Sequence, residues 1–148
     1  IYNSPLSETA VMGFEYGFRK RLHVVTTSPQ DWEAPHWDLT GAITPINRTK
    51  ARFRPLNEEG WLQPMDLGNP QRFGFRKRTR DGREEVLVIL NLDRTSAARV
   101  RVPPGVPAPP PLAWTDPLAG TSHPVTDPGE MEVGPAGILI VHPDPKFP

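Results

Sequence analysis

Proline is the feature that most constrains how this chain can fold. The sequence has 148 residues, of which 20 are proline, whereas proline makes up ~5% of an average chain. Because proline lacks a backbone N–H donor and fixes φ, it is poorly tolerated inside helices and central strands. The composition therefore excludes an all-helical bundle and favours short strands joined by stiff loops. Residues 107–111 are expected to form one such loop, in a polyproline-type conformation.

The chain contains no cysteine, which excludes a disulfide framework, a thiolate metal site and a cysteine nucleophile. It has no apolar run of the ~18–20 residues that a membrane-spanning helix needs. Residues 1–5 show neither the basic start nor the apolar run of a signal peptide. We therefore expect a cytoplasmic protein without a membrane partner.

The formal net charge is zero, but the charges are unevenly distributed along the chain. Residues 48–83 contain ten basic and four acidic side chains. Such a basic segment raises the alternative of a nucleic-acid site. However, Phe73 and Phe75 alternate with basic residues, which places the two rings on one face of a strand and the bases on the other. This pattern is typical of a solvated hairpin, so nucleic-acid binding through residues 48–83 is the least favoured alternative.

The apolar positions in the segment before Pro55 predict a helix. They repeat with a period near 3.6 residues at Leu39, Ile43, Ile46 and Phe53. The helix is expected over residues 38–54, with two alternative starts. Asp38 can serve as its N-cap, or Thr44 can cap a shorter helix with Pro45 at the first position. In both cases Pro55 ends the helix, because the residue before a proline avoids the α region.

After residue 60 the pattern changes to short strands. The alternation over residues 71–79 predicts one strand, and the apolar run 86–90 predicts a central strand buried on both faces. Asp81 and Gly82 are a strong hairpin-turn signal, so residues 71–79 are expected to pair with 85–91 in antiparallel fashion. Further strands are expected over residues 98–102, 112–114, 130–133 and 137–141.

Together these patterns predict a mainly β protein. We expect a small antiparallel β-sandwich, preceded by one α-helix and an irregular, aromatic-rich N-terminal segment. Residues 1–37 of this segment show no apolar period of their own. We therefore expect them to be mobile, or to be ordered only by a partner.

No arrangement of side chains in the sequence is typical of a catalytic centre, a cofactor site or a metal site. The four histidines lack metal-ligand spacing. Carboxylates do stand beside aromatic rings, a combination that binds sugars, because the ring stacks on the apolar sugar face while the carboxylate accepts hydroxyl hydrogen bonds. The candidate sugar-binding residues are Glu15, Tyr16, Asp31, Trp32, Glu33 and Trp37. Composition alone favours a structural role for them, because aromatic residues dominate protein cores.

Four segments in a fixed order carry a resemblance to a known family. They are Gly13-Phe14-Glu15-Tyr16-Gly17-Phe18, Asp31-Trp32-Glu33, Ile46-Asn47-Arg48 and Val86-Leu87-Val88-Ile89-Leu90-Asn91-Leu92-Asp93. In this order they resemble the C-terminal part of α-amylase-superfamily glycoside hydrolases and transglycosylases, bacterial α-glucan maltosyltransferases in particular. The resemblance extends from about residue 13 to 142, and it includes the segments 114–120 and 137–141.

The resemblance implies that the chain has two parts. Residues 1–59 would be the remnant of the end of an α/β barrel, comprising a loop and the last barrel helix. Residues 60–148 would be the C-terminal antiparallel β-sandwich domain. The family's catalytic carboxylates lie on barrel strands upstream of this segment, so no catalytic residue is expected here. The implied partners are the upstream catalytic barrel and an α-glucan or maltooligosaccharide.

Residues 3–17 show a second, local resemblance, to the thiamine-diphosphate segment of 2-oxoglutarate dehydrogenases. It implies that Glu8 would contact the aminopyrimidine ring of the cofactor. Nothing after Phe18 continues this similarity, and the diphosphate-binding half of such a site is missing. No cofactor is therefore expected.

The sequence leaves an alternative open beside the non-catalytic part of a glucan-active enzyme. The chain can instead be a stand-alone carbohydrate-binding or interaction module, in which exposed tryptophans serve as platforms for sugar rings. The candidate platforms are Trp32, Trp37, Trp61 and Trp114.

Overall fold

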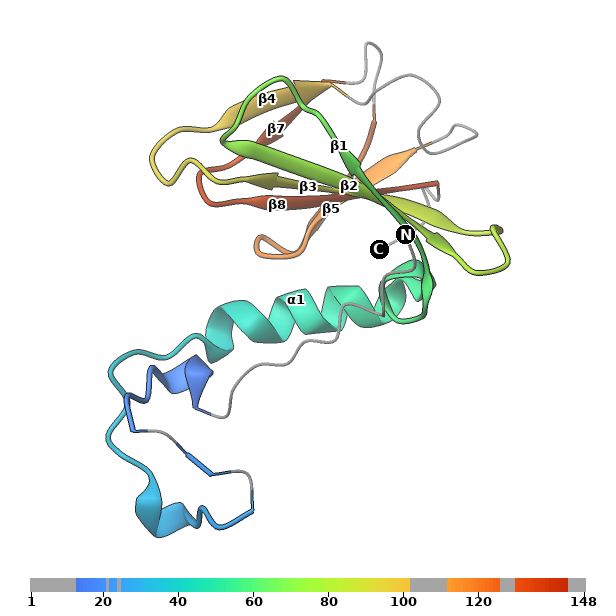
Figure 1. The fold of residues 1–148 in the computed structure, drawn as a ribbon. Coiled ribbons are helices and arrows are strands. Elements are labelled where there is room, and N and C mark those ends of the chain that lie inside the picture. The colour runs from blue at the N-terminus through green and yellow to red at the C-terminus, as the bar shows by residue number, and fades with distance from the viewer. Residues whose placement is uncertain (1–12, 21, 24, 102–111, 126–129, 144–148) are drawn as a thin grey trace.

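The computed structural model describes residues 13–20, 22–23, 25–101, 112–125 and 130–143 (Figure 1). Some of the expectations above fall outside these residues. They concern the loop 107–111, the last residue of the strand expected at 98–102, and most of the dehydrogenase-like segment 3–17, including Glu8.

The described part of the chain is mainly β, as the sequence predicts, with one α-helix and short 3-10 helices. The strands are β1 (Gly60–Met65), β2 (Arg72–Thr79), β3 (Glu85–Asn91), β4 (Ala98–Arg101), β5 (Ala113–Asp116), β6 (Thr121–Pro124), β7 (Glu130–Val133) and β8 (Ile138–His142). They form two antiparallel sheets. The larger sheet has the order β1-β2-β3-β8-β5-β6, and β4 pairs with β7 in a separate two-stranded sheet.

Strands β2 and β3 form the predicted antiparallel hairpin. Their register places Arg78 opposite Glu85 and Arg72 opposite Asn91. Gly82 in the connecting turn has a φ of 70°, a left-handed conformation that costs glycine little because it has no Cβ. The turn signal at Asp81 and Gly82 is therefore confirmed.

Strand β3 is buried on both faces, as its continuous apolar sequence predicts. Alternate side chains of a strand point to opposite faces, so Leu87 and Ile89 share one face and Val86 and Val88 the other. None of the four is more than 4% exposed. Each face of this strand consequently belongs to a different core cluster.

The first core cluster joins the two sheets. Leu87 of β3 and Val141 of β8 pack in it with Val100 of β4 and with Met131 and Val133 of β7. Every one of these side chains is at most 5% exposed. The two-stranded sheet therefore packs on the face of the larger sheet that carries Leu87 of β3 and Val141 of β8.

The second core cluster covers the opposite face of the larger sheet. Phe53 and Leu56 pack there against Val86 and Val88 of β3 and Ile140 of β8. Phe53 follows the α-helix, and Leu56 ends the 3-10 helix η3 (Arg54–Leu56). The chain between helix and sheet thus anchors the two to each other.

Helix α1 spans Thr40–Arg52, within the expected segment. The N-cap residue is Leu39 and not Asp38 as expected, but Asp38 Oδ1 accepts hydrogen bonds from the backbone N and the Oγ1 of Thr40, at 2.8 and 2.6 Å. The alternative start at Thr44 is wrong, because Pro45 lies inside the helix. The missing N–H of Pro45 removes only the hydrogen bond to the carbonyl of Gly41. The helix ends before Pro55, as predicted.

Strands β1 and β6, which were not predicted from the sequence, lie at the two edges of the larger sheet. Each contains a proline, Pro64 in β1 and Pro124 in β6. Proline weakens a strand prediction, but an edge strand tolerates it where the missing N–H would face solvent. The strand expected at residues 112–114 is β5, which extends to Asp116.

Lys77 is an exception to the expected placement of the bases. Its position on β2 has the same parity as Phe75, so its side chain lies on the face of the second core cluster and is 1% exposed. Within the described residues, no group accepts a hydrogen bond from its Nζ. The expected solvated face holds for the arginines of β2 but is wrong for Lys77.

Replacing Lys77 with methionine should raise the free energy of unfolding at pH 7 by about 1–3 kcal/mol, the cost of an unsatisfied buried polar group. Methionine keeps most of the volume of the side chain. Urea denaturation followed by circular dichroism measures the change. Lys77→Ala serves as the control, since it also removes the stem and should be less stable than Lys77→Met. A destabilised Lys77→Met would contradict the prediction.

Candidate functional site

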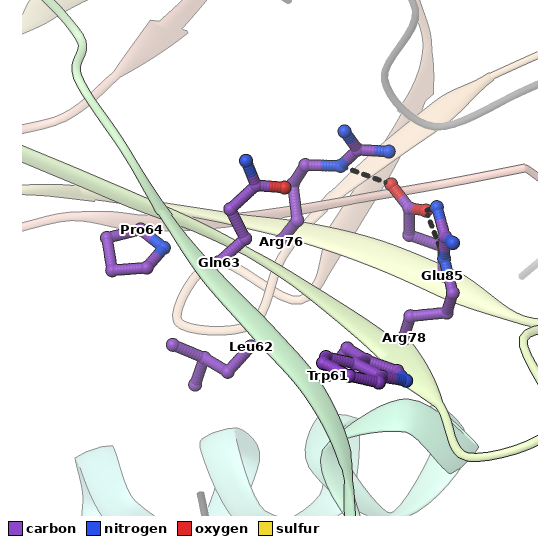
Figure 2. Close-up of a pocket in the computed structure, with 7 residues that line it drawn as sticks. All are labelled: Trp61, Leu62, Gln63, Pro64, Arg76, Arg78 and Glu85. Carbon is purple, nitrogen blue, oxygen red and sulfur yellow. Dashed lines mark hydrogen bonds and ion pairs between the residues drawn. The ribbon is translucent and has the colours of Figure 1, made fainter. Parts of the chain in front are cut away.

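A hollow lies on the larger sheet at its β1 edge (Figure 2). Its volume is about 400 Å³. The lining residues come from β1, β2 and the start of β3: Trp61, Leu62, Gln63, Pro64, Arg76, Arg78 and Glu85. We call it the Trp61 hollow.

One face of the larger sheet changes from apolar to polar side chains along its strands. Met65 and Leu67 pack on the first core cluster, and Leu87 and Ile89 of the same face are fully buried in it. Toward the other end of the strands, the apolar rows give way to polar ones. Arg76 of β2, which lies opposite Leu87, is the first residue of the polar rows.

Two rows of paired residues cross the hollow. Trp61 of β1 lies opposite Arg78 of β2, which lies opposite Glu85 of β3. In the next row, Gln63 lies opposite Arg76. Figure 2 shows the indole of Trp61 beside the Arg78 side chain, and the indole is accessible because Trp61 is 59% exposed.

Glu85 holds both arginines in place. Its Oε1 accepts a hydrogen bond from Nε of Arg76 at 2.6 Å, and its Oε2 accepts two from Nε and Nη2 of Arg78 at 3.0 and 2.9 Å. The Glu85 side chain is only 12% exposed. We call this arrangement the Glu85 clamp. It fixes two flexible side chains, so that they need not lose that freedom when something binds.

The clamp also sets the ionisation of its carboxylate. Burial raises the pKa of Glu85, but the hydrogen bonds from Arg76 and Arg78 outweigh this effect, so the pKa lies below its ordinary value. The carboxylate is therefore ionised at neutral pH. With two guanidinium groups and one carboxylate, the clamp carries a net charge of +1.

Arg54, another basic residue of the segment 48–83, also forms ion pairs with acidic side chains. Arg54 bonds Glu58 at 2.8 Å, Asp81 at 3.2 Å and Glu84 at 3.3 Å. These contacts tie η3 to the β2–β3 turn. Together with the Glu85 clamp and the buried Lys77, they reduce the basic surface that residues 48–83 offer to a nucleic acid.

The candidate sugar-binding residues of the N-terminal segment lie in two 3-10 helices and the loops around them. Glu15 and Tyr16 belong to η1 (Phe14–Tyr16), and Asp31 ends η2 (Pro29–Asp31). The segment brings some of the rings together: the Phe18 centroid lies 5.7 Å from that of Tyr16 and 6.3 Å from that of Trp32.

The acids of this segment hold its loops. Asp31 Oδ2 accepts hydrogen bonds from N and Oγ of Ser28 at 3.0 and 3.1 Å, and Asp31 Oδ1 pairs with Lys20 Nζ at 3.1 Å. These bonds, led by the one from the Ser28 backbone, lower the pKa of Asp31 to about 2. Glu33 accepts hydrogen bonds from the backbone N–H groups of Arg19 and Lys20, which lower its pKa.

The remaining candidates contribute backbone and ring contacts. The backbone O of Tyr16 accepts from His36 N at 2.9 Å, and that of Glu15 accepts from Leu39 N at 2.8 Å. Trp37 Nε1 donates to the backbone O of Phe14 at 3.2 Å. The six residues thus build one local structure, and their role in sugar binding stays a prediction.

A buried polar chain runs across the other face of the larger sheet. Ser122 Oγ donates to the backbone O of Trp114 at 3.3 Å and accepts from Thr115 Oγ1 at 3.2 Å. Because the single hydroxyl hydrogen of Thr115 is then used, Nε2 of His142, 3.1 Å away, must donate to Thr115. His142 is 2% exposed, and the centroid of its ring lies 4.9 Å from that of Phe53. This series of hydrogen bonds is therefore a structural feature of the core.

No family model matches this chain, and no curated protein is significantly similar to it. Among the described residues, no group of three or more histidines or carboxylates is arranged to hold a metal ion. Nor does the described part of the chain contain a helix with the length and apolarity needed to cross a membrane.

Trp61 was one of four candidate platforms predicted from the sequence, but the residues around it were not predicted as part of a site. The signal for Arg78 and Glu85 was present: a hairpin centred on Asp81 and Gly82, with strands at 71–79 and 85–91, places these two side chains across from each other. The position of Trp61 beside Arg78 could not be predicted from the sequence, because it depends on the pairing of β1, a strand that was not predicted.

Replacing Glu85 with glutamine should lower the free energy of unfolding at pH 7 by about 1–3 kcal/mol, because hydrogen bonds between charged groups are lost. Since the folded-state pKa of Glu85 is lowered from its ordinary 4.5, the clamp stabilises the protein above that pH. Its contribution is lost as the pH falls through the lowered pKa. Urea denaturation at pH 7 and pH 3 should therefore show a difference between the two proteins that shrinks at pH 3.

The matched control is Glu130→Gln. Glu130 pairs with Arg101 at 3.0 Å, but these side chains are 50% and 62% exposed. An exposed ion pair contributes ~0–1 kcal/mol, so the control should change little at either pH. Equal effects of the two substitutions would contradict a special role of the clamp.

Proposed function

We propose that this chain is the non-catalytic, C-terminal part of an α-glucan-active enzyme of the amylase type. In this proposal residues 1–59 come from the end of the catalytic barrel, and residues 60–148 form a β-sandwich domain that stabilises it. The protein would be bacterial and cytoplasmic. The order of the four family-like segments suggests this assignment, and the structure adds one supporting observation.

That observation is the poorly covered apolar surface of the first part. In α1 the only buried residue is Thr49, although Ile43 and Ile46 lie on one helix face. In the segment before it, Phe14, Trp32 and Trp37 are 56%, 54% and 51% exposed. Figure 1 shows this part extending away from the sheets. Large exposed apolar groups are uncommon on isolated proteins and mark surfaces that pack on something else.

In residues 60–148, by contrast, apolar side chains pack into core clusters. The first core cluster joins side chains of both sheets, which is the packing expected of a sandwich. The second cluster fixes the chain after α1 to the outer face of the larger sheet. A domain of this kind can hold the last barrel helix in place through Phe53 and Leu56.

The stand-alone binding module is the second candidate. One observation favours it: Trp61 is the most exposed tryptophan among the described residues, at 59%, and it lies beside fixed polar side chains. The two candidate functions differ in whether residues 1–59 need another domain to cover them. A module functions without a barrel, whereas the C-terminal part of an enzyme needs one to cover its aromatic residues.

We expect the purified chain to show no turnover of maltooligosaccharides, with or without maltose 1-phosphate, because the family's catalytic carboxylates lie upstream of it. Product analysis by chromatography against a buffer blank tests this. Robust hydrolysis or transfer by the chain would overturn the proposal.

The gene offers an independent test. If the proposal holds, the reading frame upstream of Ile1 encodes a barrel with three catalytic carboxylates. In that longer protein, removal of residues 60–148 should lower the melting temperature of the barrel. An upstream frame without a barrel would leave the stand-alone module as the better assignment.

A further inference from the structure

We propose that the Trp61 hollow binds α-1,4-glucan, with a glucose ring stacked on the indole of Trp61. This inference rests on the proposed function for its substrate class, and on the geometry of the hollow for its position. It places glucan binding on the β part of the chain, away from the acid–aromatic pairs of the N-terminal segment.

Trp61 has the properties of a platform. It lies on the edge strand β1, so no further strand of the larger sheet limits access to it. Its side chain is held beside Arg78 by the strand register, and more than half of its surface is accessible. An aromatic side chain of this size contributes a large apolar face at little cost in conformational entropy.

Polar side chains that can form hydrogen bonds with sugar hydroxyls lie next to Trp61. Gln63 lies two residues further along β1, about 7 Å away, and its amide both donates and accepts hydrogen bonds. Arg76, opposite Gln63, is bound to Glu85 through Nε. Within the described residues, its two terminal nitrogens make no hydrogen bond, so they can donate to a sugar. The edge of a pyranose ring stacked on Trp61 would contact the side chains of Gln63 and Arg76.

The clamp favours a neutral polyhydroxyl ligand over an anion. Both oxygens of Glu85 already bind the arginines, so the net charge of the hollow is only +1. A phosphate group would have to compete with a carboxylate that is fixed in place. The hollow has a volume of about 400 Å³, which suits one or two units of a long chain that lies across the sheet.

Isothermal titration calorimetry with maltoheptaose tests the assignment on the full 148-residue chain. The wild-type chain should bind, and Trp61→Ala should bind at least tenfold more weakly. Phe14→Ala is the matched control, because Phe14 is an aromatic residue of similar exposure, 56%, and is not among the candidate sugar-binding residues. It should bind like wild type. Thermal melting verifies that each variant is folded.

A spectroscopic readout separates direct contact from a change in folding. In a ¹H–¹⁵N spectrum the indole signal of Trp61 is the one absent from Trp61→Phe, which keeps an aromatic ring. This signal should shift on addition of maltoheptaose more than the other three indole signals. Gln63→Ala should weaken binding by about threefold to tenfold without changing the melting temperature.

Three results would overturn the inference. One is unchanged binding in Trp61→Ala. Another is equal binding of cellohexaose, which would show a sugar platform without preference for α-linked glucan. The third is displacement of maltoheptaose by inorganic phosphate, which would show an anion site. None of these results touches the turnover assay or the upstream reading frame, so failure of the site and failure of the proposed function are distinguishable.

Discussion

Burial of β3 on both faces is the constraint on which the rest of the structure depends. Val86 and Val88 anchor one core cluster, Leu87 and Ile89 the other, and each of these side chains contributes ~1.5–3 kcal/mol on burial. A strand of this kind needs a cover on either side. The two-stranded sheet provides one. Phe53 and Leu56, which follow α1, provide the other, so the chain directly after the helix becomes part of the β core.

The same constraint explains where the candidate site lies. The two-stranded sheet is short, with four residues in each strand, so it covers only the apolar rows around Leu87 and Ile89. The rows beyond them stay open and carry polar residues. The Glu85 clamp lies at this boundary, because Arg76 is paired with Leu87 of the core while its hydrogen bond goes to Glu85 of the open end.

Features that depend on neighbouring residues could be predicted from the sequence, whereas features that depend on residues distant in the sequence could not. The 86–90 run, the turn at Asp81 and Gly82 and the end of α1 before Pro55 depend on neighbouring residues, and all three were found. Strand β1 was missed because it contains Pro64 and because, among the described residues, it pairs with β2 alone. The buried position of Lys77 followed from parity with Phe75, yet its chemistry argued for the surface. Packing outweighed that preference.

The difference between the two acid-and-aromatic regions lies in how their backbone groups are satisfied. The N-terminal segment contains no strand and only short 3-10 helices among its described residues before α1, so its backbone N–H groups need side-chain acceptors. Asp31 and Glu33 supply them, and their chemistry is used within the segment. Around Trp61 the strand ladders already satisfy the backbone. Polar side chains such as Gln63 are not needed there to hold the chain together, which is the condition under which a surface can be used for recognition.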